Sequence, residues 1–332
     1  MKAPPGGIAE RDIVAVLAGH WGVAAIQLDY LAVGFGDHHW MATEAGGRRW
    51  FVTVAELGGG WRDAVAEQGW ADLRAAMGVV IALRHAGLEF AVAPVPTRDG
   101  RALARLDDQH ATTVFPYLQG TAGTFGRRMP QRERRALIEM LARLHGVAAA
   151  FRDAAPVRDL TPASLPGLRA ALSDLGRPWA GGPYSEPARH FLAGRAASIA
   201  AALARFADLA RQAAASGPPV ITHGEPHPGN VLRSGRRLLL IDWDTMGVAL
   251  PERDLWHVAG SDSAEAAMYC ELTGRVVSDA ALAAYRLRWQ LDDLGLSVAQ
   301  FRSPHADDAN TAAMWNDLPR LADDITQLAD AG

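Results

Sequence analysis

The chain has 332 residues, which is enough for one large domain or two of ordinary size with a buried core. Apolar residues make up 49% and charged residues 21%, so the composition excludes a disordered chain as the expectation. The formal net charge of -4 argues against a nucleic-acid-binding protein, and the single cysteine, Cys270, excludes an internal disulfide framework and a cysteine-rich zinc site.

The N-terminal sequence has no apolar core of signal-peptide length, and no uncharged apolar run reaches the roughly 18 residues of a membrane span. Together with the lone cysteine, this predicts a soluble, cytoplasmic protein. Neither a nucleic acid nor a membrane is expected as a partner.

The first part of the chain predicts a small sheet with helices beside it. Apolar residues recur at helical spacing in residues 11–19. Residues 25–33 and 49–54 are rich in strand formers and are expected to pair through a glycine turn. A longer helical pattern covers residues 71–85, with Gly87 as its C-terminal stop.

Three further strands are predicted before the chain changes character, at residues 89–95, 102–106 and 111–117. Gly120 then breaks the strand pattern. The segments that follow are rich in alanine and leucine and predict a helical region, with helices at residues 131–145, 198–215 and from 264 to the end.

A segment between these helices combines polar residues at an informative spacing. His223 and Glu225 lie in a turn rich in proline and glycine, and Asn230 follows Glu225 by five residues. The apolar run 238–241 then ends on Asp242. In protein kinases a catalytic carboxylate is followed at this spacing by an asparagine, and a metal-binding aspartate follows the next strand. The segment therefore predicts a site for Mg²⁺ and a nucleotide.

Each of these polar residues suits one part of phosphoryl transfer. Mg²⁺ prefers hard oxygen ligands and keeps some water, so the Asp242 carboxylate and the Asn230 amide are the expected metal ligands. The Glu225 carboxylate is expected to orient the attacking hydroxyl and to accept its proton. His223 is expected to brace the catalytic loop through hydrogen bonds.

Two other interpretations of the loop stay open at this point. Such residues are common in turns that do no chemistry, although the strand that ends on Asp242 favours the kinase interpretation. His223, Glu225 and His227 have the spacing of zinc ligands on a strand, but two prolines and the nearby asparagine fit zinc poorly.

The loop resembles that of the aminoglycoside phosphotransferase and choline kinase superfamily, which reads His-Gly-Asp with an asparagine five residues after the aspartate, followed by Ile-Asp-Trp or Ile-Asp-Phe. Residues 115–120 resemble the hinge of this family, and 141–145 resemble its helix before the insertion. Residues 241–255 are similar to the spectinomycin phosphotransferase branch. The corresponding residues here are His223, Gly224, Glu225 and Asn230, then Ile241, Asp242 and Trp243.

The resemblance implies an α+β, protein-kinase-like fold with two lobes. A small lobe built on an antiparallel sheet would cover residues 1–118 and bind the nucleotide, with a hinge at 115–119. A larger helical lobe with the catalytic loop and the acceptor site would cover residues 119–332. The implied ligands are ATP or GTP, Mg²⁺ and a small hydroxylated acceptor. The backbone at Phe115, Tyr117 and Leu118 would bind the base of the nucleotide.

The residues expected near the phosphates depart from the family pattern. Gly34 and Gly36 lie where the phosphate-covering loop is expected. The strand lysine that holds the phosphates in the family is replaced by Thr53, and the chain has no lysine after Lys2. Another cation or donor is therefore expected to take its place, and the candidates are Arg48, Arg49, His38 and His39.

The expected catalytic base departs from the family pattern as well, because Glu225 stands where the family has an aspartate. Its side chain is one methylene longer, and a displacement of about 1 Å in a reacting group can cost on the order of 100-fold in rate. Thr53 and Glu225 therefore favour an alternative, a catalytically impaired kinase-fold protein with a binding or regulatory role. The intact pair Asn230 and Asp242 favours an active enzyme.

The acceptor is expected to bind a helix near the C-terminus. The spacing of Trp289, Asp292 and Asp293 puts them on about one face of that helix, where an aromatic ring beside two carboxylates suits a cationic sugar or amine. Asp244 is a further expected acceptor contact. A surface helix whose acids pair with neighbouring arginines explains the pattern equally well.

The leading hypothesis is a kinase that transfers the γ-phosphate of ATP or GTP to a hydroxyl of a small acceptor. The expected acceptor is an aminoglycoside, an aminocyclitol or another polar metabolite. Antibiotic resistance and biosynthesis are both compatible with such an enzyme.

Overall fold

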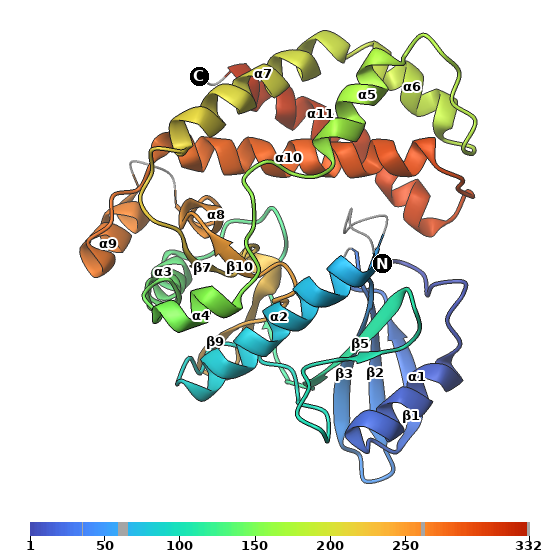
Figure 1. Ribbon diagram of the computed structural model, residues 1–332, viewed down its shortest axis with the longest axis vertical. Coiled ribbons are helices and arrows are strands. Elements are labelled where there is room, and N and C mark those ends of the chain that lie inside the picture. The colour runs from blue at the N-terminus through green and yellow to red at the C-terminus, as the bar shows by residue number, and fades with distance from the viewer. Residues whose placement is uncertain (35, 59–65, 260–262, 331–332) are drawn as a thin grey trace. The chain divides into compact units, whose positions relative to one another are not determined.

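The computed structural model of the protein forms two compact units by packing, and each is described by itself. The first unit combines Met1–Arg158 with Gly217–Val277, and the second combines Asp159–Ser216 with the chain from Ser278. The predicted lobe boundary at residue 118 falls inside the first unit and stays a prediction. The structure describes residues 1–34, 36–58, 66–259 and 263–330 (Figure 1).

The first unit opens with a five-stranded antiparallel sheet in the order β1-β2-β3-β5-β4. Helical structure precedes and follows its first three strands, so the predicted α+β class is confirmed. The strands are β1 (Ala25–Leu31), β2 (His38–Glu44), β3 (Arg49–Glu56), β4 (Ala104–Arg105) and β5 (His110–Pro116), and the helical segments are α1 (Glu10–Val16), the π-helical turn η1 (Leu17–Trp21) and α2 (Ala66–His85).

One face of this sheet carries the apolar core of the N-terminal region. Trp40, Val52 and Val114 come from three neighbouring strands and are almost completely buried. Ile13 and Leu17 from the first helical segment pack in the same cluster and are fully buried. Because successive side chains of a strand point to opposite faces, the residues that alternate with this set are left for the other face.

Two strand predictions for this region are wrong. Residues 25–33 and 49–54 do not pair directly, because β2 lies between them. The sequence prediction takes the glycine turn at Gly34 and Gly36 as the direct connection between those two strands, and it therefore leaves out β2. Residues 89–95 form only one isolated bridge, between Ala91 and Leu240. This segment contains Pro94, which has no amide hydrogen to donate to a ladder.

The rest of the first unit combines helices with short strands that surround the predicted catalytic loop. The helix predicted at 131–145 is confirmed as α3 (Gln131–His145). The other helices are α4 (Ala149–Ala154), α8 (Glu252–Leu255), α9 (Ala264–Thr273) and the 3-10 turn η2 (Pro228–Asn230), and the strands are β6 (Thr121–Ala122), β7 (Val220–Thr222), β8 (Val231–Ser234), β9 (Arg237–Leu240) and β10 (Gly247–Ala249).

The described part of the second unit is helical. The long helix α10 packs against α5, α7 and α11 (Figure 1), and the helix predicted at 198–215 corresponds to α7. Across the described ranges of the whole chain, no helix combines the length and the apolar character needed to cross a bilayer. The helices are α5 (Leu165–Ser173), α6 (Ser185–Ala193), α7 (Ala196–Ala213), α10 (Asp279–Arg302) and α11 (Ala309–Asp330).

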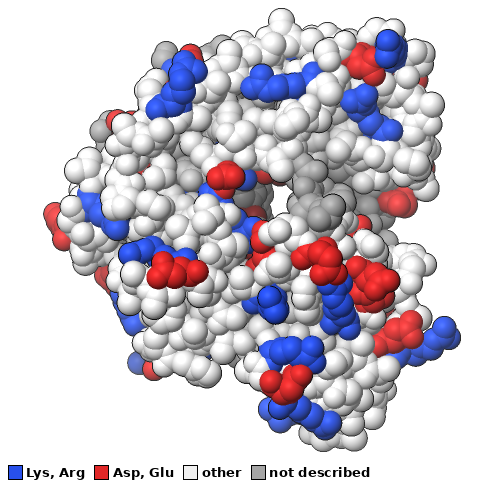
Figure 2. All heavy atoms as spheres, viewed as in Figure 1, with Lys and Arg blue, Asp and Glu red and all other residues white. Residues whose placement is uncertain are grey.

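Charges of both signs are interspersed on the face shown in Figure 2. Many are held as short-range pairs within one element, as where the Arg320 guanidinium lies 2.7 Å from the carboxylates of Asp317 and Asp324. Exposed pairs of this kind contribute about 0–1 kcal/mol each to stability, so we assign them no role in fixing the fold.

Candidate active site

The predicted catalytic loop leaves the buried strand β7 at His223, whose side chain is completely buried. Its Nε2 atom lies 2.9 Å from the carbonyl oxygen of Ile241, and its Nδ1 atom lies 3.2 Å from the backbone nitrogen of Glu225. A carbonyl can only accept and a backbone N–H can only donate, so Nε2 carries the proton and Nδ1 accepts. The imidazole thereby ties the loop to the segment that precedes Asp242.

Burial keeps the His223 ring neutral. It lowers the pKa of His223 to about 4, because a desolvated imidazolium is unfavourable, and this outweighs the nearby carboxylate of Asp254. A neutral ring with one donor and one acceptor is what the two backbone contacts require. His223 is therefore well placed to hold the loop in shape, and its assignment to catalysis stays a prediction.

Asn230 joins the two halves of the loop. Its side-chain Nδ2 atom donates to the backbone carbonyl oxygen of Glu225 at 3.0 Å. The backbone carbonyl oxygen of Asn230 accepts from the backbone amide of Ile241 at 3.1 Å. The side chain of Asn230 is nearly buried, which protects both hydrogen bonds from water. These contacts place Glu225, Asn230 and the start of the Asp242 segment next to one another.

Asp242 has a strained backbone. Its φ angle is 67°, and it is the only residue other than glycine with positive φ in the described part of the chain. The left-handed conformation costs roughly 1–2 kcal/mol for an ordinary residue, although aspartate and asparagine tolerate it best. The side chain is exposed, whereas Trp243 after it is fully buried and donates through Nε1 to the carbonyl of Leu240 at 2.9 Å. The buried tryptophan thus fixes a turn that points the carboxylate outward.

A buried carboxylate that the sequence interpretation did not assign accepts hydrogen bonds from the backbone of the loop. Asp254 on α8 accepts from the backbone amides of His223 and Gly224, at 2.8 and 2.6 Å. His145, at the end of α3, lies 3.0 Å from the same carboxylate. Burial acts to raise the pKa of Asp254, but the hydrogen bond from His145 and nearby positive charge prevail and lower it. Both residues lay in stretches that resembled the family, which was the only sequence signal for them.

Glu225 and His227 lie beside this network. The Glu225 side chain is 29% exposed, and its Oε2 atom is 3.9 Å from Nε2 of His227. Burial lowers the pKa of His227 to about 4. Since the ring nitrogens of His223 are both committed to backbone groups, and no set of three or more His, Cys, Asp or Glu side chains in the described ranges could hold a metal, the zinc interpretation has no support.

The loop does fit a Mg²⁺ ion that is held mainly by phosphate and water. Such an ion needs few protein ligands, and the usual set is a carboxylate with an amide oxygen. The Asn230 amide nitrogen is engaged as a donor, which leaves Oδ1 as its coordinating atom. The exposed carboxylate of Asp242 would be the second ligand.

Thr53, in the place of the expected lysine, faces a histidine. In the β2–β3 register Thr53 lies opposite His39, and its Oγ1 atom is 3.2 Å from Nδ1 of that ring. His38 is opposite Val54, so it belongs to the other face of the sheet. Burial lowers the pKa of both histidines to about 4.

The other residues predicted to bind the nucleotide lie around the same sheet. Arg49 places its guanidinium carbon 4.1 Å from the ring centre of Tyr117, and Arg48 lies 4.1 Å over Trp50. Phe115 lies one residue before the end of β5, and Leu118 lies two residues beyond that end. Gly34 and Gly36 adopt positive φ angles of 68° and 98°, and Phe35 between them lies outside the described residues. Nucleotide contacts for these residues stay predictions.

The predicted acceptor residues on α10 lie in the second unit. Asp292 accepts from the Ser164 hydroxyl at 2.5 Å and pairs with Arg288 at 3.5 Å. Trp289 and Asp293 are partly buried on the same helix. Asp244 belongs to the first unit, where its backbone carbonyl accepts from Arg158. The pairing of Asp292 matches the surface-helix interpretation, and acceptor binding by the set is untested.

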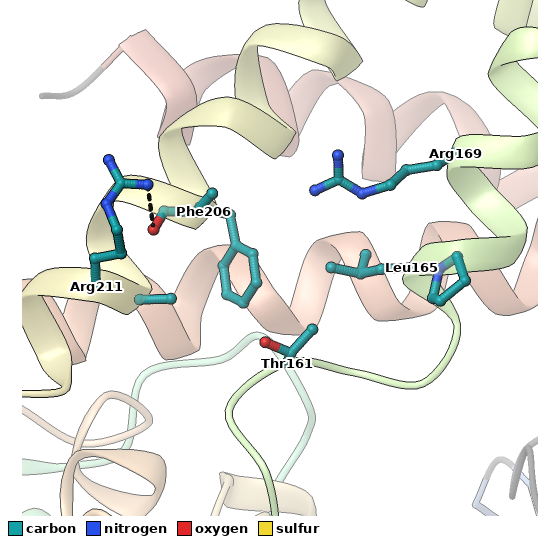
Figure 3. Close-up of a pocket in the computed structure, with 8 residues that line it drawn as sticks. Thr161, Leu165, Arg169, Phe206 and Arg211 are labelled. Atoms are coloured by element: carbon teal, nitrogen blue, oxygen red, sulfur yellow. Dashed lines mark hydrogen bonds between the residues drawn. The ribbon is translucent and has the colours of Figure 1, made fainter.

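A hollow of about 320 Å³ lies in the second unit, between α5 and α7. Figure 3 shows the side chains that line it. Phe206 forms its apolar wall, and Arg169 and Arg211 lie at its sides. Arg211 donates to the backbone of its own helix at Ala207. None of the predicted site residues lines this hollow, so it does not enter the assignment of the active site.

The sheet, the loop and the helical region together define a kinase-like phosphotransferase. The sequence matches the phosphotransferase enzyme family over residues 30–302, and the chain belongs to that family. The predicted superfamily and the kinase-like fold are therefore confirmed.

Individual relatives agree with this membership. Protein StrN of Streptomyces griseus is 30% identical over 266 residues, covering 73% of this chain and 74% of StrN. Spectinomycin phosphotransferase APH(9)-Ia, solved with ADP and spectinomycin, superposes with a TM-score of 0.74 at 16% identity, covering 98% of both chains. Amicoumacin kinase hAmiN, solved with AMP-PNP and Ca²⁺, has a TM-score of 0.61 at 14% identity, covering 96% of this chain and 94% of that one. At these identities the solved structures show a common fold.

Proposed function

We propose that this phosphotransferase is a small-molecule kinase that transfers the γ-phosphate of ATP or GTP to a hydroxyl of an aminoglycoside-like or aminocyclitol-like acceptor. The observation that carries the proposal is that Asn230 joins the two parts of the catalytic loop. Asn230 bonds to the backbone of Glu225 and of Ile241, so a base and two metal-ligand candidates lie together, and the strained turn of Asp242 completes the set.

The residues divide the work of the reaction. The acceptor oxygen attacks the γ-phosphorus, the bond from that phosphorus to the bridging oxygen of the diphosphate breaks, and ADP or GDP leaves. Glu225 orients the hydroxyl and takes its proton. Asn230 and Asp242 would hold Mg²⁺, which when bound would neutralise charge on the phosphates. His223 and Asp254 keep the loop backbone in the geometry that this transfer needs.

The acceptor class is supported by the relatives and by charge. One similar structure contains spectinomycin and another is named for amicoumacin, and both compounds are the kind of small polar acceptor proposed here. We assign Trp289, Asp292 and Asp293 to this acceptor, since carboxylates beside an aromatic ring favour cationic groups. Asp244 is proposed as a further contact. The likeness to the spectinomycin enzymes makes an aminocyclitol the first compound to test.

A second candidate is a kinase-fold protein that binds ligands without turnover. Thr53 in place of the lysine favours it, because the nucleotide then lacks the usual cation on its phosphates. Titration calorimetry with ATP, with and without Mg²⁺, followed by ATP-consumption assays with aminocyclitols, aminoglycosides and polar metabolites, separates the two. The kinase proposal expects Mg²⁺-dependent binding and acceptor-dependent consumption. Binding without consumption for any acceptor would favour the regulatory candidate.

Changing the length of the base gives a sharper test of an active enzyme. If the loop is spaced for the longer side chain, Glu225→Ala and Glu225→Asp are both expected to lose rate, by about 100-fold for the shortened carboxylate, because it no longer reaches the hydroxyl. Steady-state ATP consumption with an accepted substrate measures this. If Glu225→Asp were faster than the natural enzyme, the chain would be better described as a decayed kinase.

A further inference from the structure

Arg158 contacts both a helix of the nucleotide-binding region and the segment that follows Asp242. Its Nη1 atom lies 3.2 Å from the Oδ2 atom of Asp72, on α2. Its Nε atom donates to the carbonyl oxygen of Met246 at 3.2 Å, and its Nη2 atom donates to the carbonyl oxygen of Asp244 at 3.4 Å. One guanidinium thus contacts two segments that are far apart in sequence, α2 and residues 244–246.

The backbone around Arg158 is held against the same segment. The amide of Arg158 donates to the carbonyl of Val248 at 2.9 Å, and the amide of Val248 donates to that of Pro156 at 2.8 Å. Gly247 lies so close that a Cβ atom there would be 2.5 Å from the Pro156 carbonyl oxygen and 2.7 Å from Cγ of Arg158. Only glycine allows this approach, so the position of the arginine is set by backbone pairing and not by its side chain alone.

We propose that Arg158 is a positioning residue for the metal-binding turn. It holds the carbonyls of Asp244 and Met246, and through Asp72 it fixes their distance from α2, so that the Asp242 carboxylate stays where Mg²⁺ and the phosphates need it. This inference rests on the proposed kinase function.

Arginine suits this role for geometric reasons. Its guanidinium is planar, keeps its charge at all working pH values and offers donors in several fixed directions, whereas lysine is a point charge that cannot make all three contacts at once. The side chains of Arg158 and Asp72 are 23% and 35% exposed, so water screens their attraction. We therefore expect orientation of the turn, and not overall stability, to depend on the pair.

The test compares nucleotide binding with and without metal. Titration of ADP into the full chain, in Mg²⁺ and then in EDTA, reports how well the metal site is formed without any need for turnover. Arg158→Lys is expected to weaken ADP binding about 10-fold in Mg²⁺ and to leave it nearly unchanged in EDTA, as is usual for residues that orient metal ligands. Asp72→Asn should cause a smaller loss of the same kind, and this loss should disappear in the Arg158→Lys background.

Arg105 provides a matched control. Its Nη2 atom pairs with the carboxylate of Glu67 on the same helix α2 at 2.6 Å, and its guanidinium carbon lies 4.6 Å from the Trp70 ring centre. Arg105→Lys perturbs an ion pair of α2 that has no contact with the metal-binding turn. This variant should keep the ratio of ADP affinities in Mg²⁺ and EDTA at the natural value, and thermal melts of all variants show that each is folded.

The possible results separate this inference from the function on which it rests. Natural protein that binds ADP equally in Mg²⁺ and EDTA would overturn the metal assignment, and the role of Arg158 with it. Natural protein with a clear Mg²⁺ effect that survives intact in Arg158→Lys would overturn only the role of Arg158. A loss of the effect in Arg105→Lys as well would reduce the role to general packing of α2.

Discussion

Replacement of Asp242 by asparagine is expected to lower turnover by more than about 100-fold, because the variant loses the charge that compensates Mg²⁺ beside the phosphates. The fold should survive. The residue is exposed, and asparagine tolerates its φ angle of 67° better than other residues, so neither burial nor backbone strain changes. The same variant should weaken nucleotide binding mainly when Mg²⁺ is present. Steady-state kinetics, nucleotide titrations and a thermal melt measure the three quantities.

Asp108 is a suitable control for this experiment, since it is an exposed aspartate in the turn between β4 and β5. Asp108→Asn removes the same charge from the first unit without touching the loop, and its kinetics should match those of the natural protein. An Asp242→Asn variant that consumed ATP at a near-natural rate would remove Asp242 from the metal site.

The catalytic loop could be predicted from the sequence because its information is local. Glu225 and Asn230 lie within one turn, and Asp242 follows directly after a short apolar strand. Residues that are this close in sequence also lie close together in the folded chain. The amide contact between Asn230 and Glu225 is the three-dimensional form of that spacing. The helix at 131–145 was predicted correctly for a similar reason, since its apolar residues repeat at the helical period.

Contacts between distant segments could not be predicted in the same way. Asp254 and His145 are separated by 109 residues, and Arg158 and Asp72 by 86. The hydrophobic periodicity of the sequence around either partner does not predict such a contact. The strand β2 was missed because its pairing is decided by its neighbours on both sides, and residues 89–95 were assigned to a strand because an apolar buried linker has the same composition as one.

The missing lysine leads to the second large expected effect, on nucleotide binding. His39 is nearly buried with its Nδ1 atom 3.2 Å from the Thr53 hydroxyl, while a Cβ atom added at Gly34 would lie 3.2 Å from its Nε2 atom. Since burial lowers the pKa of His39 to about 4, the ring is neutral near pH 7. If Nδ1 accepts from Thr53, the proton lies on Nε2, which faces the glycine turn expected to cover the phosphates.

We therefore expect a neutral His39 to donate to a phosphate oxygen where the family uses a lysine. His39→Ala should weaken ATP binding by about 10-fold or more, the usual cost of a hydrogen bond to a charged group. Thr53→Val, which removes only the hydroxyl that orients the ring, should weaken it less. His38→Ala is the matched comparison, because that histidine lies on the opposite face of the sheet, and it should have the smaller effect of the two histidine variants.

The dependence of affinity on pH tells a neutral donor from a charged one. A folded-state pKa of about 4, below the ordinary value near 6.5, means that the unfolded chain binds more protons between these values, so the stability due to the buried neutral ring is lost as pH falls through this range. Affinity is best measured above pH 6.5, where His39 stays neutral and ATP binding should change little up to pH 8. An affinity that fell steeply as pH rose through 6.5 would indicate a charged imidazole instead. Unchanged binding in His39→Ala, together with tighter binding in Thr53→Lys, would show that nothing replaces the lysine and would favour the regulatory protein.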